Sequence, residues 1–494
     1  MAIAPPRGKS LEELRFANSF AALGPAFSEP RTPAGIAGAR LVAFSPEAAA
    51  LIDLRPGEER RAEFTALAAG TGLVPGLEPV AALYGGHQFG VWAGQLGDGR
   101  AILLGEVHDD ATSTGLRGEP WELHLKGGGK TAFSRFADGR AVIRSTVREF
   151  LASEAMHHLG VPTTRALAMT AGEDPVLRER VERAATLIRM APSFVRFGTF
   201  EIFHYRKQYA DVRTLADYAI DRFYPECGAE AERYACFLGA VVERTAALMA
   251  HWQAVGFSHG VMNTDNFSIL GLTLDYGPYG FMETYEPGLI CNHTDESGRY
   301  AFDRQPTIGL WNCYALAEAL SSLITAEQAQ AALARYEAVY RTTFLALLRA
   351  KLGLRDVRDA DADLALELFR LLEARRIDWT NFWRALSQGE EPALALLGAD
   401  EASQGWFARY AARIAGEGRA DAERRAAMRA VNPKYVLRNW VAQEAIAACE
   451  AGDDAVVNAV LNVLRAPFEE HPGREDWAQP APERYRGLSV SCSS

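Results

Sequence analysis

Several features that mark particular classes of protein are scarce in this sequence or missing from it. Its 494 residues include only six cysteines and no C-x-x-C motif, which argues against a disulfide framework or a zinc cluster. No window approaches the run of about 18 uncharged apolar residues that a transmembrane helix needs. The first residues, MAIAPPRGKSLEEL, lack the apolar core of a signal peptide. We therefore expect a cytoplasmic protein that does not enter a membrane.

Basic residues are also too few for a dedicated nucleic-acid-binding protein, because the formal net charge is −11. A local basic cleft is still compatible with this charge. Hydrophobic residues make up 48% of the chain and charged residues 23%, which is the balance of an ordinary globular protein. The length is enough for two or three domains and a large core.

The segment His259–Gly277, with the sequence HGVMNTDNFSILGLTLDYG, combines a polar loop, an apolar run and an acidic turn. The loop carries Asp265 and Asn266, the apolar run from 267 to 274 is typical of a buried strand, and Asp275 follows directly. Oxygen ligands on two turns joined by a short strand suit Mg²⁺, which shares such ligands with substrate phosphates. The other interpretation is that these side chains only form turns.

The same segment has the spacing of a protein-kinase catalytic core, H-R-D-x-x-x-x-N followed by D-F-G. His259 and Asn266 keep the separation of the kinase His and Asn, and Asp275–Gly277 takes the place of D-F-G. The position of the kinase's catalytic Asp holds Val261, and a carboxylate returns at Asp265. The pattern therefore predicts intact metal ligands without the usual catalytic base.

A glycine-rich stretch lies upstream, at residues 84–100, and contains six glycines in 17 residues. Glycine allows positive φ and a close approach of backbone N–H groups to an anion, so this stretch could hold phosphate. At the end of this stretch, Gly97 and Gly99 indicate a tight turn before the cation Arg100. This pattern also fits a plain β-hairpin. The apolar residues 101–107 are then typical of a strand.

The next predicted strand, residues 122–126, ends in Lys126, which could direct a charge at a phosphate or lie in solvent beside a turn. A helix is expected from 141 to 159, because apolar residues recur there at helical spacing. Glu149 lies off that apolar stripe, so it could reach a neighbouring lysine or face water. The adjacent histidines near the end of this helix point in different directions, which argues against a metal site.

Two arginines, Arg189 and Arg196, lie in or beside apolar runs. A buried guanidinium needs an anionic partner, either a carboxylate of the protein or a phosphate, and the sequence leaves both open. From Ile308 to about residue 465 the chain is almost entirely helical in pattern.

The order of these motifs is that of a bilobal kinase: a glycine-rich hairpin, a strand lysine, a helix with a glutamate, an asparagine-bearing loop and an Asp-Tyr-Gly turn. The predicted fold class is therefore α+β, a bilobal protein-kinase-like (pseudokinase) fold with a glycine-rich β N-lobe, a helical C-lobe and extra C-terminal helices. The predicted regions are an N-terminal extension (1–75), an N-lobe with nucleotide-binding residues (76–200), a C-lobe with the catalytic and metal loop (201–345) and a C-terminal helical region with a flexible tail (346–494).

Longer motifs carry a closer resemblance that covers nearly the whole chain. They are YGGHQFGVWAGQLGDGR, ELHLKGGGKTAFSRFADGRAVIRSTVREFLASEA, GVPTTRAL, RMAPSFVRFG, HGVMNTDNFSILGLTLDYGPYGFM, CNHTDESGRYAF, NPKYVLRN and the terminal CSS. In these motifs the chain resembles the selenoprotein O family, the YdiU-like protein adenylyltransferases. The resemblance implies a pseudokinase-like fold that binds ATP in a flipped orientation and transfers AMP to Ser, Thr or Tyr of proteins, with Mg²⁺. It also allows UMP transfer from UTP with Mn²⁺.

The resemblance further implies roles for single residues, and no matched position departs from the family's pattern. The implied nucleotide-binding residues are Gly97, Gly99, Arg100, Lys126, Asp138, Gly139, Arg189, Arg196 and Asp275. Asp265 is implied as the proton acceptor, and Asn266 and Asp275 as the metal ligands. Lys126 is implied to pair with Glu149.

Two thiols have a place in the same resemblance. Cys291 follows the Asp-Tyr-Gly turn, and Cys492 lies near the C-terminal end, where some members of the family carry selenocysteine. In bacterial relatives a loop cysteine and a tail cysteine are thought to form a regulatory disulfide. The resemblance therefore implies that Cys291 pairs with Cys492 and that a thiol reductant activates the enzyme.

Two other functions stay open at this point. An ordinary kinase would transfer the γ-phosphate and release ADP, and Val261 at the kinase Asp position weighs against it. A non-catalytic pseudokinase would bind ATP as a scaffold, and the intact Asn266 and Asp275 weigh against that. The residues alone do not choose between attack at the α-phosphorus and attack at the γ-phosphorus.

Overall fold

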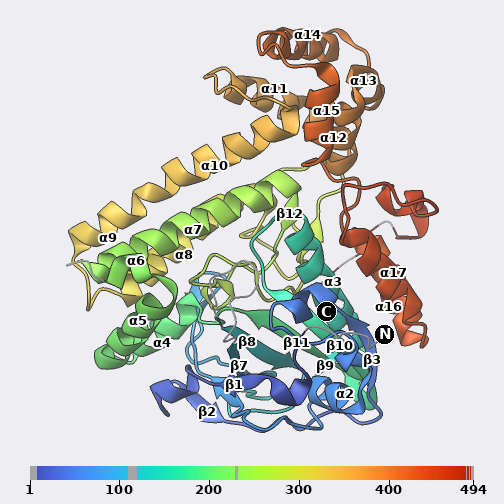
Figure 1. Cartoon of the computed structure of the whole chain (residues 1–494). Coiled ribbons are helices and arrows are strands. Elements are labelled where there is room, and N and C mark those ends of the chain that lie inside the picture. The colour runs from blue at the N-terminus through green and yellow to red at the C-terminus, as the bar shows by residue number, and fades with distance from the viewer. Residues whose placement is uncertain (1–7, 109–119, 229–231, 486, 489, 491–494) are drawn as a thin grey trace, which may run out of the picture.

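The computed structural model of the chain describes residues 8–108, 120–228, 232–485, 487, 488 and 490. Its architecture is mixed α/β: one large sheet is built from residues before 192, and helices dominate from there on (Figure 1). This confirms the expected combination of a β-rich first part and a helical remainder.

The large sheet has nine strands and is antiparallel throughout its pairings. Its strands are β1 (Arg15–Ala17), β2 (Ser28–Pro30), β3 (Arg40–Phe44), β4 (Val80–Ala82), β7 (Ala101–His108), β8 (Trp121–Lys126), β9 (Ala141–Val142), β10 (Arg165–Leu177) and β11 (Val181–Ala191). The main path runs β2-β4-β7-β8-β11-β10-β3, with β1 on β7 and β9 on β11. Strands from the first 75 residues therefore share one sheet with those that follow.

Two short hairpin-like pairs lie outside this sheet. Strand β5 (His87–Gln88) pairs with β6 (Val91–Trp92), and β12 (Phe257–Ser258) pairs with β13 (Gly280–Phe281). The second pair flanks the segment that carries Asp265 and Asp275, so it brings the two ends of that segment together.

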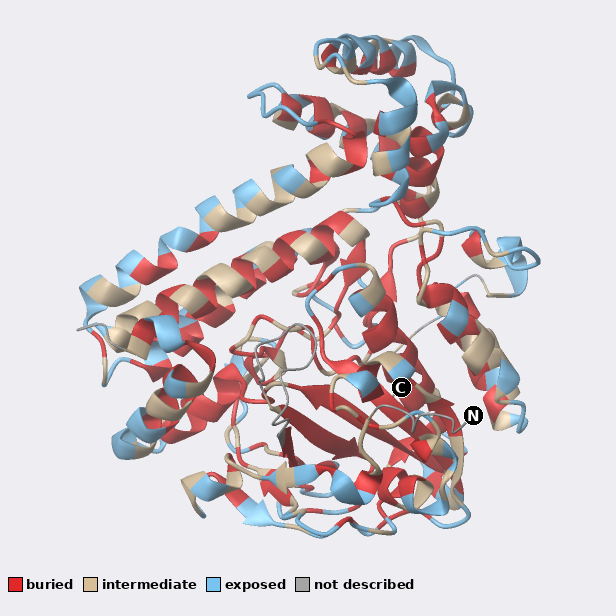
Figure 2. Cartoon of the chain, in the orientation of Figure 1, coloured by how far each residue is buried: buried red, intermediate tan, exposed pale blue. Residues whose placement is uncertain are grey.

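Side chains alternate between the two faces of the sheet, and each face packs on helices. Leu123 and Leu125 of β8 belong to the core shared with α1 (Pro46–Ala50) and α2 (Ala62–Ala69). On the opposite face α3 (Ile143–His158) packs against β10 and β11. Figure 2 shows the central strands buried along their length. One face of β8 is thus apolar, and the other carries Glu122, His124 and Lys126.

The remaining helices form three groups. They are α4 (Phe197–Tyr205), α5 (Tyr209–Phe223), α6 (Pro225–Gly228), α7 (Arg233–Val255), α8 (Gln305–Ala319), α9 (Ala326–Leu333), α10 (Arg335–Leu352), α11 (Asp361–Ala374), α12 (Trp379–Gln388), α13 (Glu390–Leu397), α14 (Glu401–Ala415), α15 (Asp421–Arg429), α16 (Asn439–Glu450) and α17 (Ala455–Leu464). Helices α7 and α10 lie side by side, and α11–α15 gather at the far end of α10 around a core of their own (Figure 1). None of the described helices combines the length and apolar character that a bilayer-spanning segment requires.

The third group, α16 and α17, returns to the first part of the chain and packs on α3 (Figure 1). Arg40 of β3 lies 2.8 Å from Asp454, and the Asn458 side chain donates to the Val42 carbonyl at 2.8 Å. Arg465, just after α17, is ion-paired with Glu47 of α1. These contacts fasten the last helices to the edge strand of the sheet.

Two local expectations require correction. The apolar run 267–274 is buried but is not a strand: it makes isolated bridges at Ser268 and Thr273, because a turn at Gly271, with φ of 67°, interrupts it. The cysteine pattern argued against a disulfide framework, and it did not predict the bond between Cys227 and Cys236 that joins α6 to α7.

Candidate active site

A cavity of about 650 Å³ lies where the polar face of the sheet meets the segment 261–278. The predicted site residues that line it are Gly97, Gly99, Arg100, Lys126, Arg189, Arg196, Asp265, Asn266 and Asp275. The structure therefore brings together residues that are up to 178 positions apart, Gly97 and Asp275 being the extremes. Their roles as nucleotide-binding, catalytic or metal-binding groups stay predictions.

A buried cluster of charges forms the inner wall of the cavity. Lys126 is ion-paired with Glu149 of α3, and Arg189 Nη1 lies 3.0 Å from Glu149 Oε1. Arg189 and Arg196 each contact one carboxylate oxygen of Asp275. Within this cluster three cations contact two carboxylates, a surplus of one cation over the carboxylates that they contact. Such a surplus in a buried site favours an anionic ligand.

Asp275 is the centre of this cluster, and its side chain keeps 20% of its exposure. Burial alone would raise its pKa, but Arg189, Arg196 and Lys126 outweigh that effect and hold the pKa of Asp275 well below its usual range. The residue has a positive φ of 58°, an uncommon conformation for a residue other than glycine. The two arginines therefore hold the carboxylate in place and favour its charged form.

Asp265 lies on a short 3₁₀ turn, Thr264–Asn266, and lines the same cavity. Arg196 donates to its backbone carbonyl at 2.6 Å, and the carboxylate itself forms no ion pair with the part of the chain that the structure describes. Its Oδ1 is buried without a hydrogen-bond partner among the described residues. Burial raises the pKa of Asp265 to about 7, although Arg196 and a hydrogen bond from Gln88 act in the other direction. This carboxyl group is suited to take up a proton near neutral pH.

The oxygen atoms needed for a divalent cation are present at Asn266 and Asp275. The Asn266 amide nitrogen donates to the Val261 carbonyl at 2.9 Å, which fixes the side chain and leaves its amide oxygen unpartnered within the part of the chain that the structure describes. An amide oxygen and a carboxylate are ligands that Mg²⁺ and Mn²⁺ accept. The residues present therefore fit a divalent cation, provided that the arginines release Asp275.

His259, which occupies the place of the kinase histidine, is hydrogen-bonded to the backbone next to the turn that carries Asp275. It is buried and stacks on Trp252, with 5.1 Å between the ring centroids. Its Nε2 lies 2.9 Å from the Leu274 carbonyl, and since a carbonyl only accepts, Nε2 carries the proton. The ring thus holds the residue that directly precedes Asp275.

The glycine-rich stretch divides into two parts with different contacts. Its first part forms the β5–β6 hairpin, which packs on the loop of Asp265: the His87 N–H donates to Thr264 Oγ1 at 2.7 Å. A Cβ at Gly86 would lie 2.8 Å from Asp265 Oδ1. These glycines let a hairpin approach the loop, so the hairpin interpretation describes this part better than a phosphate cradle.

The second part, Gly97–Arg100, forms a wall of the cavity. A Cβ at Gly97 would lie 2.6 Å from Phe133 Cγ, and one at Gly99 would lie 3.0 Å from the Phe133 carbonyl oxygen. The Ser134 hydroxyl donates to the Gly99 carbonyl. These two glycines therefore allow the loop around residue 133 to fold over the cavity edge.

Asp138 and Gly139 are not among the described residues that line the cavity. Asp138 is bound at both carboxylate oxygens by Arg178, at 2.7 and 2.9 Å, and this pairing lowers its pKa. Gly139 has φ of 73°, and a Cβ there would overlap the Gly129 backbone at 2.2 Å. Both residues close the base of the loop 130–138, and their implied contact with a nucleotide stays a prediction.

Two residues near the site were not singled out from the sequence. Gln88 lines the cavity together with Asp265, and His124 Nδ1 lies 3.0 Å from Arg189 Nε. For His124 a signal existed, because it is two residues before Lys126 in a predicted strand and so shares its face. For Gln88 no such signal existed, because the glycine-rich stretch around it indicated turns or phosphate binding and not a role for this side chain.

Of the two thiols in the implied disulfide, the structure describes only Cys291. Cys291 is half-buried, its Sγ lies 2.9 Å from the Pro278 carbonyl, and burial raises the pKa of the thiol to about 11. Cys492 lies outside the described residues. Val490, two positions before it, forms a bridge with Asn292, which is next to Cys291. The tail therefore passes beside the loop that carries Cys291.

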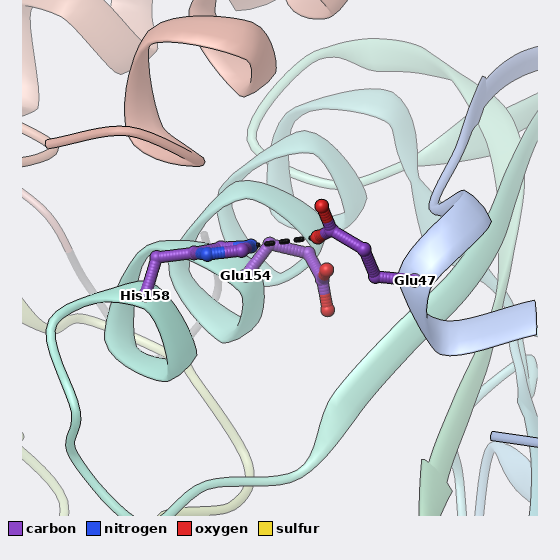
Figure 3. A group of neighbouring side chains, drawn as sticks. All are labelled: Glu47, Glu154 and His158. Carbon is purple, nitrogen blue, oxygen red and sulfur yellow. Dashed lines mark ion pairs between the residues drawn. The ribbon is translucent and has the colours of Figure 1, made fainter. Parts of the chain in front are cut away.

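A second group of carboxylates and histidine lies on α1 and α3 (Figure 3). The ligand atoms of Glu47, Glu154 and His158 all lie within 4.8 Å of one another. Each carboxylate already has an arginine: Arg165 binds Glu154 at 2.8 and 2.9 Å, and Arg465 pairs with Glu47. We interpret this group as a structural link between helices, because its negative charge is already compensated.

Comparisons with known proteins agree with this geometry. A family model described as protein adenylyltransferase SelO matches residues 10–465. A protein nucleotidyltransferase YdiU from Myxococcus xanthus is 54% identical over 492 residues, which cover 98% of this chain and 100% of the relative. Proteins of the same name from Thioalkalivibrio sulfidiphilus and Azotobacter vinelandii are 52% and 48% identical, each over 98% of this chain and 99% and 100% of the relative.

Proposed function

The chain belongs to the SelO family of protein adenylyltransferases and is a nucleotidyltransferase, and from that premise we propose that it transfers AMP from ATP to Ser, Thr or Tyr hydroxyls of proteins. The observation that carries this reaction is the arrangement of one cavity: it is lined by a cation cluster and by a buried carboxyl group that forms no ion pair with the described residues.

The cation cluster supplies the binding site for the triphosphate. Lys126, Arg189 and Arg196 bind its oxygens and stabilise the charge that grows on pyrophosphate as it leaves. Asn266 and Asp275 would hold Mg²⁺ or Mn²⁺, which when bound shields the phosphate charge from the incoming oxygen. With the metal present, Asp275 would serve as its ligand instead of as the partner of the arginines, and the Nη groups of Arg189 and Arg196 would be available to the phosphates.

Asp265 serves as the proton acceptor. It takes the proton of the acceptor hydroxyl as that oxygen bonds to the α-phosphorus and the bond to the pyrophosphate oxygen breaks. This role agrees with its unpartnered Oδ1 and with a pKa that burial raises to about 7. Val261 at the position of the kinase base is consistent with a changed attack geometry, in which the nucleotide lies flipped relative to that in kinases.

The overall organisation that we propose is the bilobal, kinase-like one, with the region boundaries at 75, 200 and 345. It is supported by a sheet that ends at residue 191, by helices that follow, and by a cavity lined from both parts. The extra C-terminal helices correspond to α11–α17. We place the enzyme in the cytoplasm, with proteins as its acceptors.

Redox control through Cys291 and Cys492 is part of the same proposal. The bridge between Asn292 and Val490 supports it, because it places the tail beside the Cys291 loop. A thiol reductant is expected to raise the activity of the oxidised enzyme. Rates before and after oxidation test this: a Cys492→Ala variant with the oxidation sensitivity of the wild type would contradict the pairing.

Radiolabelled ATP tests the reaction itself. ATP labelled at the α-phosphate and, separately, at the γ-phosphate is incubated with the reduced enzyme, a divalent cation and a general protein acceptor. Label on protein from the α position alone establishes AMP transfer. Label from the γ position alone makes the protein a kinase, and label from neither favours an ATP-binding scaffold. UTP labelled at the α-phosphate, with Mn²⁺ in place of Mg²⁺, measures UMP transfer in the same assay.

A further inference from the structure

His124 lies in a buried polar chain that leads to the cation cluster. It is on β8 and faces Arg189 directly across the β8–β11 pairing. The residue is 1% exposed, and its ring stacks on Phe194 with 4.5 Å between the centroids. A polar ring held this firmly on the face that carries Lys126 has lost its freedom to rotate, so its hydrogen bonds are fixed.

These hydrogen bonds determine the tautomer of the ring. Arg189 Nε lies 3.0 Å from His124 Nδ1, and because a guanidinium nitrogen only donates, Nδ1 is an unprotonated acceptor. The ring proton is therefore on Nε2, which donates to Asp98 Oδ2 at 3.1 Å. Burial lowers the pKa of His124, and Asp98 offsets only part of this effect. The ring is thus neutral and protonated at Nε2.

Asp98 anchors the other end of the chain. It is 3% exposed, and its Oδ2 also accepts from the Ala82 N–H at 3.0 Å. Since it lies between Gly97 and Gly99, it belongs to the turn that forms a wall of the cavity. The chain therefore runs from that turn, through the imidazole, to Arg189, whose Nη1 contacts Glu149 and Asp275.

We propose that His124 is a positioning residue for nucleotidyl transfer: it holds Arg189 at Nε so that the Nη groups face the triphosphate. This inference rests on the proposed function, because it requires that Arg189 bind phosphate. An arginine bound at Nε keeps its planar fork in one orientation, which lysine cannot reproduce. Preorganised donors of this kind stabilise a transition state without having to reorient.

Two substitutions separate the two hydrogen bonds of the ring. In His124→Asn the amide oxygen can take the place of Nδ1 and accept from Arg189. In His124→Gln the longer amide reaches the place of Nε2 and keeps only the bond to Asp98. We expect His124→Gln to lower kcat/KM for ATP by about 10- to 100-fold, the range found when the outer partners of site residues are lost. His124→Asn is expected to cost about threefold.

A double-mutant cycle shows whether the effect passes through Arg189. In an Arg189→Lys background, which has no Nε–H to hold, the change His124→Gln is expected to cost less than about threefold. Equal losses in both backgrounds, or equal losses for the Asn and Gln variants, would overturn the proposal. Thermal unfolding of each variant checks that it is folded. If His124→Gln does not fold, Asp98→Asn replaces it, since a neutral amide no longer selects the Nε2–H tautomer.

ATP binding provides a readout that does not depend on transfer. Calorimetric titration with ATP and a divalent cation is expected to show weaker binding for His124→Gln only when Arg189 is present. If the wild type transfers no AMP but this pattern holds, the proposed function fails and the role of His124 stands. If the wild type transfers AMP and the variants show no such coupling, the reverse is true.

Discussion

The loop that carries Asp265 and the turn that carries Asp275 line the same cavity, but they place their carboxylates in opposite surroundings. Arg189 and Arg196 bind the side chain of Asp275, and with Lys126 they hold its pKa well below the usual range despite burial. At Asp265 an arginine reaches only the backbone carbonyl, and burial raises the pKa of the side chain to about 7. The environment thus favours the charged form of one carboxylate and suits the other to the proposed role of proton acceptor.

Removing the anion is expected to have the largest effect. Asp275→Asn takes away a proposed metal ligand and leaves Arg189 and Arg196 without their carboxylate, so AMP transfer should fall by about 10³-fold or more. Transfer of α-labelled AMP measures it. Glu367→Gln on α11, which removes a half-buried carboxylate that is ion-paired with Arg409, is the matched control. Activity within a few-fold of wild type would remove Asp275 from the site.

Removing the proton acceptor is expected to be less severe and to leave binding intact. Asp265→Asn should lower turnover by about 10²-fold, because only proton transfer is lost. ATP affinity should stay within about threefold, since no cation of the described residues forms an ion pair with the carboxylate. Single-turnover rates and calorimetry separate the two quantities. A loss of affinity as large as that of Asp275→Asn would show that the two carboxylates do not differ in role.

The pH dependence sharpens the comparison further. Asp265 must lose its proton to act, so kcat/KM should rise as the pH passes about 7. Burial lowers the pKa of Lys126 to about 8, against the pull of Glu149, so activity should fall above that pH as the charge is lost. Lys126→Arg keeps its charge and should remove the alkaline limb alone. A wild-type profile that is flat from pH 6 to 9, where both groups titrate, would contradict both assignments.

The smallest effect is expected from crowding one carboxylate without changing its charge. A Cβ at Gly86 would lie 2.8 Å from Asp265 Oδ1, so Gly86→Ala should shift the carboxylate and lower turnover by about tenfold. Gly288, which has open space around it, provides the control Gly288→Ala. Equal rates for the two variants would show that the hairpin does not constrain Asp265.

The sequence predicted the elements of the fold where periodicity was strong. The strands at 101–107 and 122–126 and the helix at 141–159 correspond to β7, β8 and α3, because alternation and helical spacing reflect which side chains are buried. The strand predicted at 267–274 was wrong, since one turn at a glycine is enough to interrupt an apolar run that has the pattern of a strand. The Cys227–Cys236 bond had no motif to reveal it.

The site was predictable as a set of residues but not as a set of contacts. Motif spacing marked Asp275, a strand end marked Lys126 and an apolar run marked Arg189. Whether the arginines would meet a carboxylate or a phosphate was open, and here they meet Asp275. Arg178 takes up Asp138, a pairing across 40 residues that one sequence does not encode visibly. The bond between His124 and Arg189 depends on strand register, which becomes known only with the fold.

The return of α17 to the first strands has a consequence for how the enzyme is made. Arg40 and Asp454 are 414 residues apart in sequence, so at about 5–20 residues per second a ribosome completes the second about 20–80 s after the first. During that interval β3 and α3 lack the two helices, α16 and α17, that cover them in the folded protein. The edge of the sheet at β3 is then open to pairing with other chains. The nascent protein is therefore most exposed to aggregation before release, and its last helices act as the step that completes folding.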